Sequence, residues 1–183
     1  MVRWMVFAGA SVALACVSRA SLRAFHSHGF YRFFAWECIL ALILLNITVW
    51  FRTPLAWYQL VSWTLLITSL VPLSLGVHAL AGRGKPVAWR ECEPQLMAFE
   101  RTSTLVTTGI FGYIRHPLYC SLLLLAWGVF FKAPGWIGGL LAAASTALLF
   151  ATATAEEAEC VRFFGDAYVV YMGKTRRFVP YLL

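Results

Sequence analysis

Two groups of polar residues in the C-terminal half of the chain could do chemistry together. Arg115, His116 and Pro117 stand directly before an apolar run, and Glu156 and Glu157 follow the next apolar run. A proline suits the first turn of a helix, where unpaired N–H groups make a partial positive pole that favours an anion. Carboxylates can accept hydrogen bonds from an ammonium group or from hydroxyls. The pattern therefore predicts a site for a ligand that carries both charges.

The composition around these residues is that of an integral membrane protein. Of the 183 residues, 61% are hydrophobic and 13% are charged, whereas soluble domains average about 25% charged residues. The mean hydropathy is +0.73. No linker, repeat or low-complexity segment divides the sequence, so we expect a single membrane domain over residues 1–183.

The apolar segments predict an all-α, polytopic fold with about five transmembrane helices. Their expected ranges are 4–17, 33–51, 57–80, 118–131 and 136–155, of which the first three form an N-terminal part, residues 1–80. Pro134 and Gly135 indicate a tight turn, which makes the last two helices a hairpin. After Glu159, the aromatic residues Phe163, Tyr168 and Tyr171 lie among basic ones, which predicts an amphipathic helix on the membrane surface that turns back at Gly173.

The basic residues predict how these helices are oriented. Of the 15 lysines and arginines, five spans would place three on one side of the membrane and twelve on the other. The side with twelve is expected to be cytoplasmic and the N-terminus to lie outside. Topology and attraction to anionic membrane lipids then explain the net charge of +7, so no nucleic-acid partner is expected. The five cysteines lack CxxC spacing, and neither disulfides nor a metal site is expected.

The fourth apolar run is too short to cross a bilayer unaided. Residues 118–131 would make a helix of about 21 Å, whereas the hydrocarbon core is about 30 Å thick. Arg115 and His116 should therefore lie below the membrane surface, where charged groups are costly unless they are paired or face a cavity. We expect a functional site at this depth, with the hairpin bringing Glu156 and Glu157 beside it.

A known family shares these motifs in the same order. The stretch "LVTTGIFGYIRHPLY", followed after one apolar span by "EEAECVRFFGDAYVVYMGKTRRFVP", resembles the isoprenylcysteine carboxyl methyltransferase and phospholipid methyltransferase family of integral membrane methyltransferases. The resemblance covers residues 105–180, which we expect to form the cofactor-binding methyltransferase core.

The resemblance implies S-adenosylmethionine as cofactor and methyl transfer to a lipophilic or lipid-anchored small molecule at the cytoplasmic membrane face. The residues it implies for cofactor binding are Tyr113, Arg115, His116, Pro117, Tyr119, Glu156 and Glu157. The position two residues beyond Tyr119, which is usually glycine in this family, is Ser121 here.

The catalytic candidates are Arg177 and Glu159. An arginine can orient a carboxylate acceptor through paired hydrogen bonds, whereas a glutamate can take the proton of an amine acceptor. The sequence leaves both kinds of acceptor open.

Two other functions are compatible with parts of the pattern. Sterol-type NADPH-dependent membrane reductases look similar around a C-terminal Arg-x-x-x-Tyr segment, but they usually need more spans than this chain offers. A non-enzymatic membrane scaffold would leave Arg115, His116 and Glu157 without a common ligand. Binding of a sulfonium rather than a nicotinamide nucleotide to the purified protein would separate a methyltransferase from a reductase.

The predicted orientation is testable by thiol labelling. A membrane-impermeant maleimide should react with Cys92, and with a cysteine introduced near Arg177, only after the cytoplasmic side is opened, because both positions are expected on that side of the membrane. Labelling of either position in intact cells would contradict the orientation.

Overall fold

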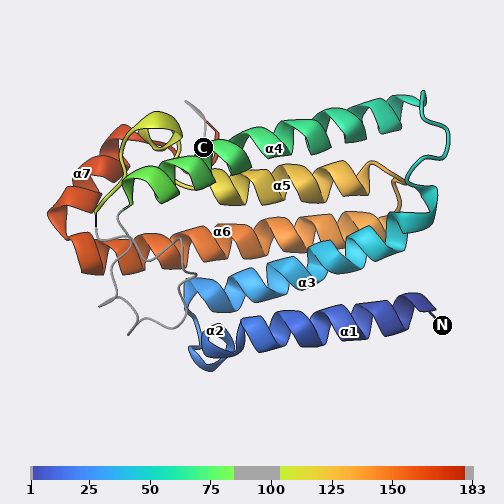
Figure 1. Ribbon diagram of the computed structural model, residues 1–183, viewed down its shortest axis with the longest axis horizontal. Coiled ribbons are helices and arrows are strands. Elements are labelled where there is room, and N and C mark those ends of the chain that lie inside the picture. Colours follow the sequence, from blue (N-terminus) through green and yellow to red (C-terminus); the bar gives the residue numbers. More distant parts are fainter. Residues whose placement is uncertain (1, 85–103, 180–183) are drawn as a thin grey trace.

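The computed structural model describes residues 2–84 and 104–179, and all regular elements in these two ranges are helices. The prediction of an all-α fold is therefore confirmed. Figure 1 shows the long helices lying side by side along one axis, with α7 at one end of the bundle. Cys92 lies outside the described residues.

The helices differ in length in a way that matters for the membrane. They are α1 (Val2–Val17), α2 (Arg19–Arg23), α3 (His28–Asn46), η1 (Ile47–Val49), α4 (Trp57–Arg83), η3 (Gly109–Gly112), α5 (Pro117–Phe130), α6 (Trp136–Phe164) and α7 (Asp166–Lys174). Among the described residues, three segments are long and apolar enough to cross a membrane: α3 with η1, α4 and α6. The apolar helices α1 and α5 are shorter, so the total of five spans stays a prediction.

Several helix boundaries differ from those predicted. Helix α3 begins at His28 rather than at Phe33, because the hydroxyl of Ser27 caps it by accepting a hydrogen bond from the N–H of Phe30 at 3.2 Å. Helix α6 runs on to Phe164, so the glutamates belong to its last turns, and it stops at Gly165, whose φ of +58° suits glycine. Helix α7 ends at Lys174, one residue beyond Gly173, where the chain was predicted to turn back.

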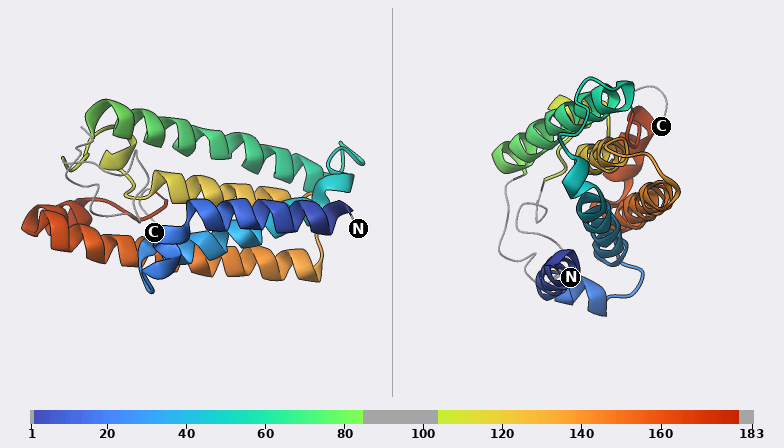
Figure 2. Two further views of the ribbon diagram at one scale, coloured as in Figure 1. Left: turned by 60° about the horizontal axis from the view of Figure 1, so that its bottom comes forward. Right: turned by 90° about the vertical axis from the view of Figure 1, so that its right-hand side faces the viewer.

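The long helices form two closely packed pairs, α4 with α5 and α3 with α6, and the pairs meet less extensively between α5 and α6 (Figure 2). Small residues permit the close approach of α4 and α5. A Cβ added at Gly128 would lie 3.0 Å from the side chain of Leu66, and one added at Gly76 would lie 3.2 Å from Pro117. These contacts hold α4 against both ends of α5 and so fix the place where α5 begins.

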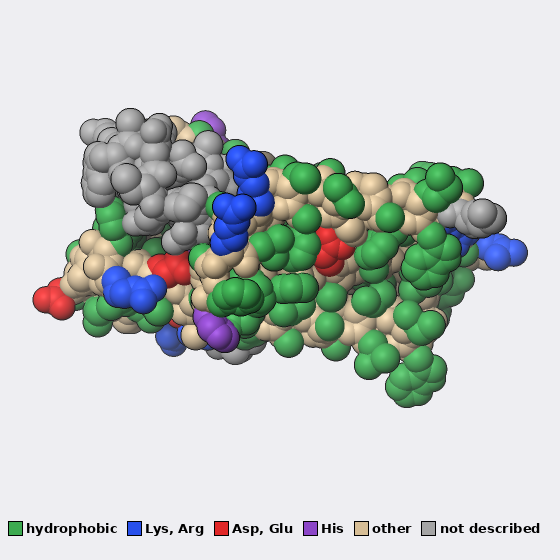
Figure 3. Space-filling model, turned by 90° about the horizontal axis from the view of Figure 1, so that it is seen from below, with side chains coloured by type: hydrophobic (Ala, Val, Ile, Leu, Met, Phe, Trp, Pro, Cys, Tyr) green, Lys and Arg blue, Asp and Glu red, His purple; other side chains and the backbone are tan. Residues whose placement is uncertain are grey.

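The surface of the bundle suits a bilayer. Figure 3 shows apolar side chains over the long middle of one face, with most charged side chains toward its ends. Helix α1 packs on α3 without burying any of its residues. In the middle of α3, Glu37 accepts a hydrogen bond of 2.6 Å from the hydroxyl of Ser11 on α1. This bond gives α1 a polar attachment to the bundle.

A buried lysine stabilises the end of the bundle opposite α7. Lys132, in the turn between α5 and α6, is 1% exposed, and its Nζ lies 3.5 Å from the ring centroid of Trp63 and 5.3 Å from that of Trp50. Nζ donates to Oε1 of Gln59 at 3.1 Å, and Nε2 of Gln59 donates to the carbonyl of Lys132 at 3.1 Å. Burial lowers the pKa of Lys132, while the aromatic faces stabilise its charged form. The contacts lock this turn to the start of α4.

Replacing Trp63 by leucine should therefore destabilise the protein. Loss of a desolvated cation–π contact is expected to lower the free energy of unfolding by about 2 kcal/mol, beyond the loss of buried area. Denaturation of the purified protein in mixed micelles measures this change. Trp136→Leu is the matched control, because Trp136 is 92% exposed. Equal effects of the two substitutions would contradict a role for the buried cation.

Candidate functional site

The site is built around the carboxylate of Glu157, whose side chain is only 4% exposed. Nε of Arg115 donates to Oε1 at 2.8 Å, and Nη2 of Arg177 donates to Oε2 at 2.7 Å. Nε2 of His116 lies 3.3 Å from Oε1. Bonds between charged partners are the strong class of hydrogen bond. Glu157 thus joins α6 to the start of α5 and to the segment that follows α7.

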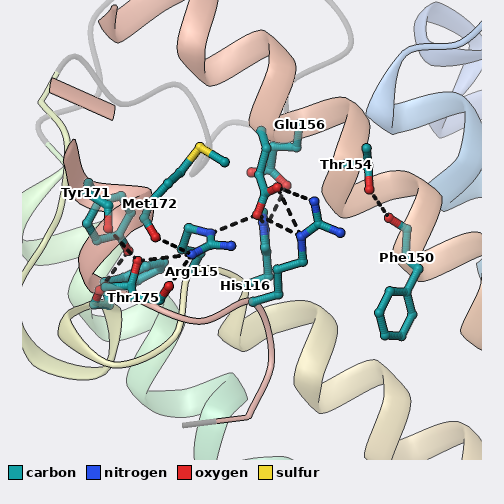
Figure 4. A network of polar contacts seen from close by, with 11 residues as sticks. Arg115, His116, Phe150, Thr154, Glu156, Tyr171, Met172 and Thr175 are labelled. Atoms are coloured by element: carbon teal, nitrogen blue, oxygen red, sulfur yellow. Dashed lines mark hydrogen bonds and ion pairs between the residues drawn. The ribbon is translucent and has the colours of Figure 1, made fainter. Parts of the chain in front are cut away.

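Arg115 also holds the end of α7, as Figure 4 shows. Its Nη1 donates to the carbonyl of Met172 at 3.1 Å and to the carbonyl of Thr175. Carbonyls at a helix C-terminus lack partners within the helix and carry partial negative charge, so a guanidinium stabilises them. Nearby, the hydroxyl of Tyr171 donates to the carbonyl of Phe111 at 2.7 Å, and burial raises the pKa of Tyr171, which keeps it a neutral donor.

The segment after α7 pairs with the segment before α5. Ile114 and Arg176 form a short parallel bridge. The N–H of Arg115 donates to the carbonyl of Arg176 at 2.7 Å, and the N–H of His116 donates to the carbonyl of Arg177 at 3.0 Å. This backbone pairing brings the side chain of Arg177 beside the buried carboxylate.

The first turn of α5 carries a buried imidazole. Pro117 is the first residue of α5, as predicted, and His116 precedes it at the cap position. The ring of His116 stacks on Tyr119 with centroids 5.4 Å apart, and its Nδ1 lies 3.5 Å from Oε2 of Glu156. Burial disfavours protonation, but hydrogen bonds and charges from Glu156 and Glu157 outweigh it, so the pKa of His116 is raised above its usual value.

Glu159 has a different partner from the other two glutamates. It accepts a hydrogen bond from the backbone N–H of His28 at 3.1 Å, and its Oε2 lies 2.6 Å from Nδ1 of the same residue. His28 was not among the predicted site residues, because the second helix was expected to begin at Phe33. The signal that could have found it is Ser27, a residue type that favours the cap position of a helix.

The structure brings most of the predicted site residues together. Those in one connected region are Arg115, His116, Pro117, Tyr119, Glu156, Glu157 and Arg177. Tyr113 precedes them and is 60% exposed, and Ser121 is buried within α5. Glu159 lies two positions beyond Glu157 on α6 but contacts α3 instead. The result is a patch of cations and carboxylates at one end of the bundle.

Two side chains in this patch, Glu156 and Arg177, can form further hydrogen bonds with a ligand. Oε2 of Glu156 is buried, and its 3.5 Å contact with His116 is longer than a charge-assisted hydrogen bond. The side chain of Arg177 is 33% exposed and can offer a further N–H to a ligand. A buried acceptor next to an accessible guanidinium suits a ligand with both a positive and a negative group.

Comparisons with known proteins find similarity to methyltransferases. Residues 95–167 match the phospholipid methyltransferase family. The curated protein-S-isoprenylcysteine O-methyltransferase of Schizosaccharomyces pombe is 36% identical over 77 residues, which are 42% of this chain and 33% of that protein. The chain thus matches about a third of the length of this relative. No solved structure matches. The family match includes His116 and Glu157, but His28 and Arg177 lie outside it.

Removal of the charge of Glu157 should destabilise the whole protein. Glu157→Gln leaves two guanidinium groups and a buried imidazole close together without a neutralising carboxylate, which typically costs about 3–5 kcal/mol. The unfolding temperature of the purified protein should fall strongly. Asp166→Asn, an exposed carboxylate at the start of α7, is the matched control and should change it little. Equal unfolding temperatures of wild type and Glu157→Gln would show that the buried carboxylate does not hold the elements together.

Proposed function

We propose that the chain belongs to the phospholipid methyltransferase family, which residues 95–167 match, and that it transfers a methyl group from S-adenosylmethionine to a lipophilic or lipid-anchored acceptor. The observation that carries this proposal is the convergence of Arg115, His116 and Pro117 with Glu156 and Glu157. The basic residues support a cytoplasmic site and an external N-terminus. We treat residues 1–183 as one membrane domain, with 105–180 as the methyltransferase core.

The residues of the site fit this cofactor. Its amino-acid end carries an ammonium group, for which the buried oxygen of Glu156 is an acceptor, and a carboxylate, which the first turn of α5 favours. The exposed ring of Tyr113 offers a stacking surface for the adenine. The residues proposed to hold the cofactor are Tyr113, Arg115, His116, Pro117, Tyr119, Glu156 and Glu157. Arg115 and Glu157 already bond to each other, so their main role in the site is to hold the start of α5 against α6.

The chemistry asks little of the protein beyond positioning. The cofactor supplies an activated methyl group whose carbon–sulfur bond breaks as a bond to the acceptor forms, which leaves a neutral thioether. With a carboxylate acceptor the product is a methyl ester, and no proton has to be removed. The chain has to bind the two reactants in line and exclude water.

The contacts favour a carboxylate acceptor over an amine. An amine must lose a proton, but Glu157 is paired with two arginines and Glu159 with His28, and Glu156 is the acceptor proposed for the cofactor's ammonium group. Arg177, in contrast, presents a partly exposed guanidinium of the kind that orients carboxylates. In this proposal Arg177 contacts the acceptor, and Glu159 is not the base. The similarity to an O-methyltransferase supports the same choice.

The acceptor is proposed to enter sideways from the bilayer. Helix α5 has 14 residues, or about 21 Å, and it begins at the site, so the site lies below the headgroups of a core about 30 Å thick. A soluble acceptor would have to lose its hydration to reach this depth. A molecule with an acyl or prenyl chain is already concentrated and oriented there.

Methylation of a lipid extract tests the proposal. Purified protein in lipid nanodiscs is incubated with methyl-labelled S-adenosylmethionine and a total lipid extract, and labelled lipids are recovered. We expect label that alkaline hydrolysis releases as methanol, because esters are base-labile and methylamines are not. Base-stable label would instead identify an amine acceptor. Absence of both cofactor binding and lipid labelling would overturn the proposed function.

The entry route is tested with a pair of acceptors that differ in chain length. Once a labelled lipid is identified, a short-chain, freely soluble analogue should be methylated far more slowly at equal bulk concentration, because it does not accumulate in the bilayer. Arg177→Gln should lower the rate with the long-chain acceptor, whereas Arg162→Gln, an exposed arginine of α6, should not. Equal rates for both chain lengths would contradict lateral entry.

A further inference from the structure

His28 brings the N-terminal half of the chain into direct contact with the glutamates of α6. The residue is 1% exposed, and it holds both oxygens of one carboxylate. Its backbone N–H donates to Oε1 of Glu159 at 3.1 Å, and Nδ1 lies 2.6 Å from Oε2. Since a carboxylate at this distance accepts a hydrogen bond, the proton must be on Nδ1. The main chain and the side chain of His28 therefore hold Glu159 in one orientation. These two bonds to Glu159 are called the clamp below.

The clamp also affects Glu156. Glu156 and Glu159 are three positions apart on α6, so they share a helix face and their negative charges repel each other. Each has an imidazole as neighbour: His116 lies 3.5 Å from Glu156, and His28 lies 2.6 Å from Glu159. The position of His28 therefore influences, through Glu159, the carboxylate proposed to face the cofactor's ammonium group.

The location of His28 is held by the fold rather than by a flexible loop. Ser27 caps α3 immediately before it, and α3 packs along α6. Its ring is thereby fixed in register with the last turns of α6. Residue 28 also lies outside the matched segment 95–167, so the family similarity does not assign it a role.

We propose that His28 is a positioning residue for methyl transfer, which holds the α6 carboxylates in place through its bonds to Glu159. The inference rests on the proposed function, because it concerns the same cofactor site. It makes α3 part of the site, although the motifs of the family lie in the C-terminal half of the chain.

Two substitutions of His28 separate its hydrogen bond from its bulk. Asparagine places its amide nitrogen near the position of Nδ1, whereas glutamine places it near Nε2. His28→Asn should therefore keep the donor to Glu159, and His28→Gln should lose it. We expect His28→Gln to raise the Kd for S-adenosylmethionine about tenfold, as for loss of a hydrogen bond to a charged group, and His28→Asn to stay within about threefold of wild type.

The binding measurement uses calorimetry on the full-length protein in detergent, with unfolding temperatures recorded for each variant. If wild type fails to bind S-adenosylmethionine, the proposed function itself is wrong. If wild type binds and both variants bind equally well, or are weakened equally, the clamp does not position the site. In a Glu159→Gln background, His28→Gln should have no further effect on the Kd; an undiminished effect there would show that His28 does not act through Glu159.

Discussion

Burial of one carboxylate, that of Glu157, is the constraint on which the rest of the site depends. A charge removed from water is tolerated only beside partners that compensate it, and here those partners are two guanidinium groups and an imidazole. Arg115 and Arg177 come from segments on either side of α6 in the sequence. To pair with one carboxylate, the start of α5, the last turns of α6 and the segment after α7 must meet at one point. The backbone pairing of Ile114 with Arg176 and the bond from Tyr171 to Phe111 reinforce that meeting point.

Much of this arrangement could be predicted from residue types. Apolar runs gave the long helices, and Pro117 marked the first residue of α5 because proline fits a first turn. The short turn at Pro134 and Gly135 implied that the start of α5 and the end of α6 lie at the same end of a hairpin. That geometry is why Arg115 and Glu157, far apart in the sequence, could be expected to meet.

The remaining contacts depend on features that produce no recognisable pattern of residues in the sequence. Lys132 is buried against Trp63 and Trp50, and nothing in their sequence separation indicates an aromatic partner. The pairing between Ile114 and Arg176 uses backbone groups, which every residue has. His28 was missed because one hydroxyl, that of Ser27, starts α3 earlier than the apolar run does.

The packing of the helices in two pairs has a consequence for how the site is held together. Arg115 precedes α5, which belongs with α4, while Glu157 sits on α6, which belongs with α3. The bond between them bridges the boundary where the two pairs meet less extensively. Any tilt of one pair against the other would change the distance between these two charges, so the bond couples the shape of the site to the way the two pairs pack.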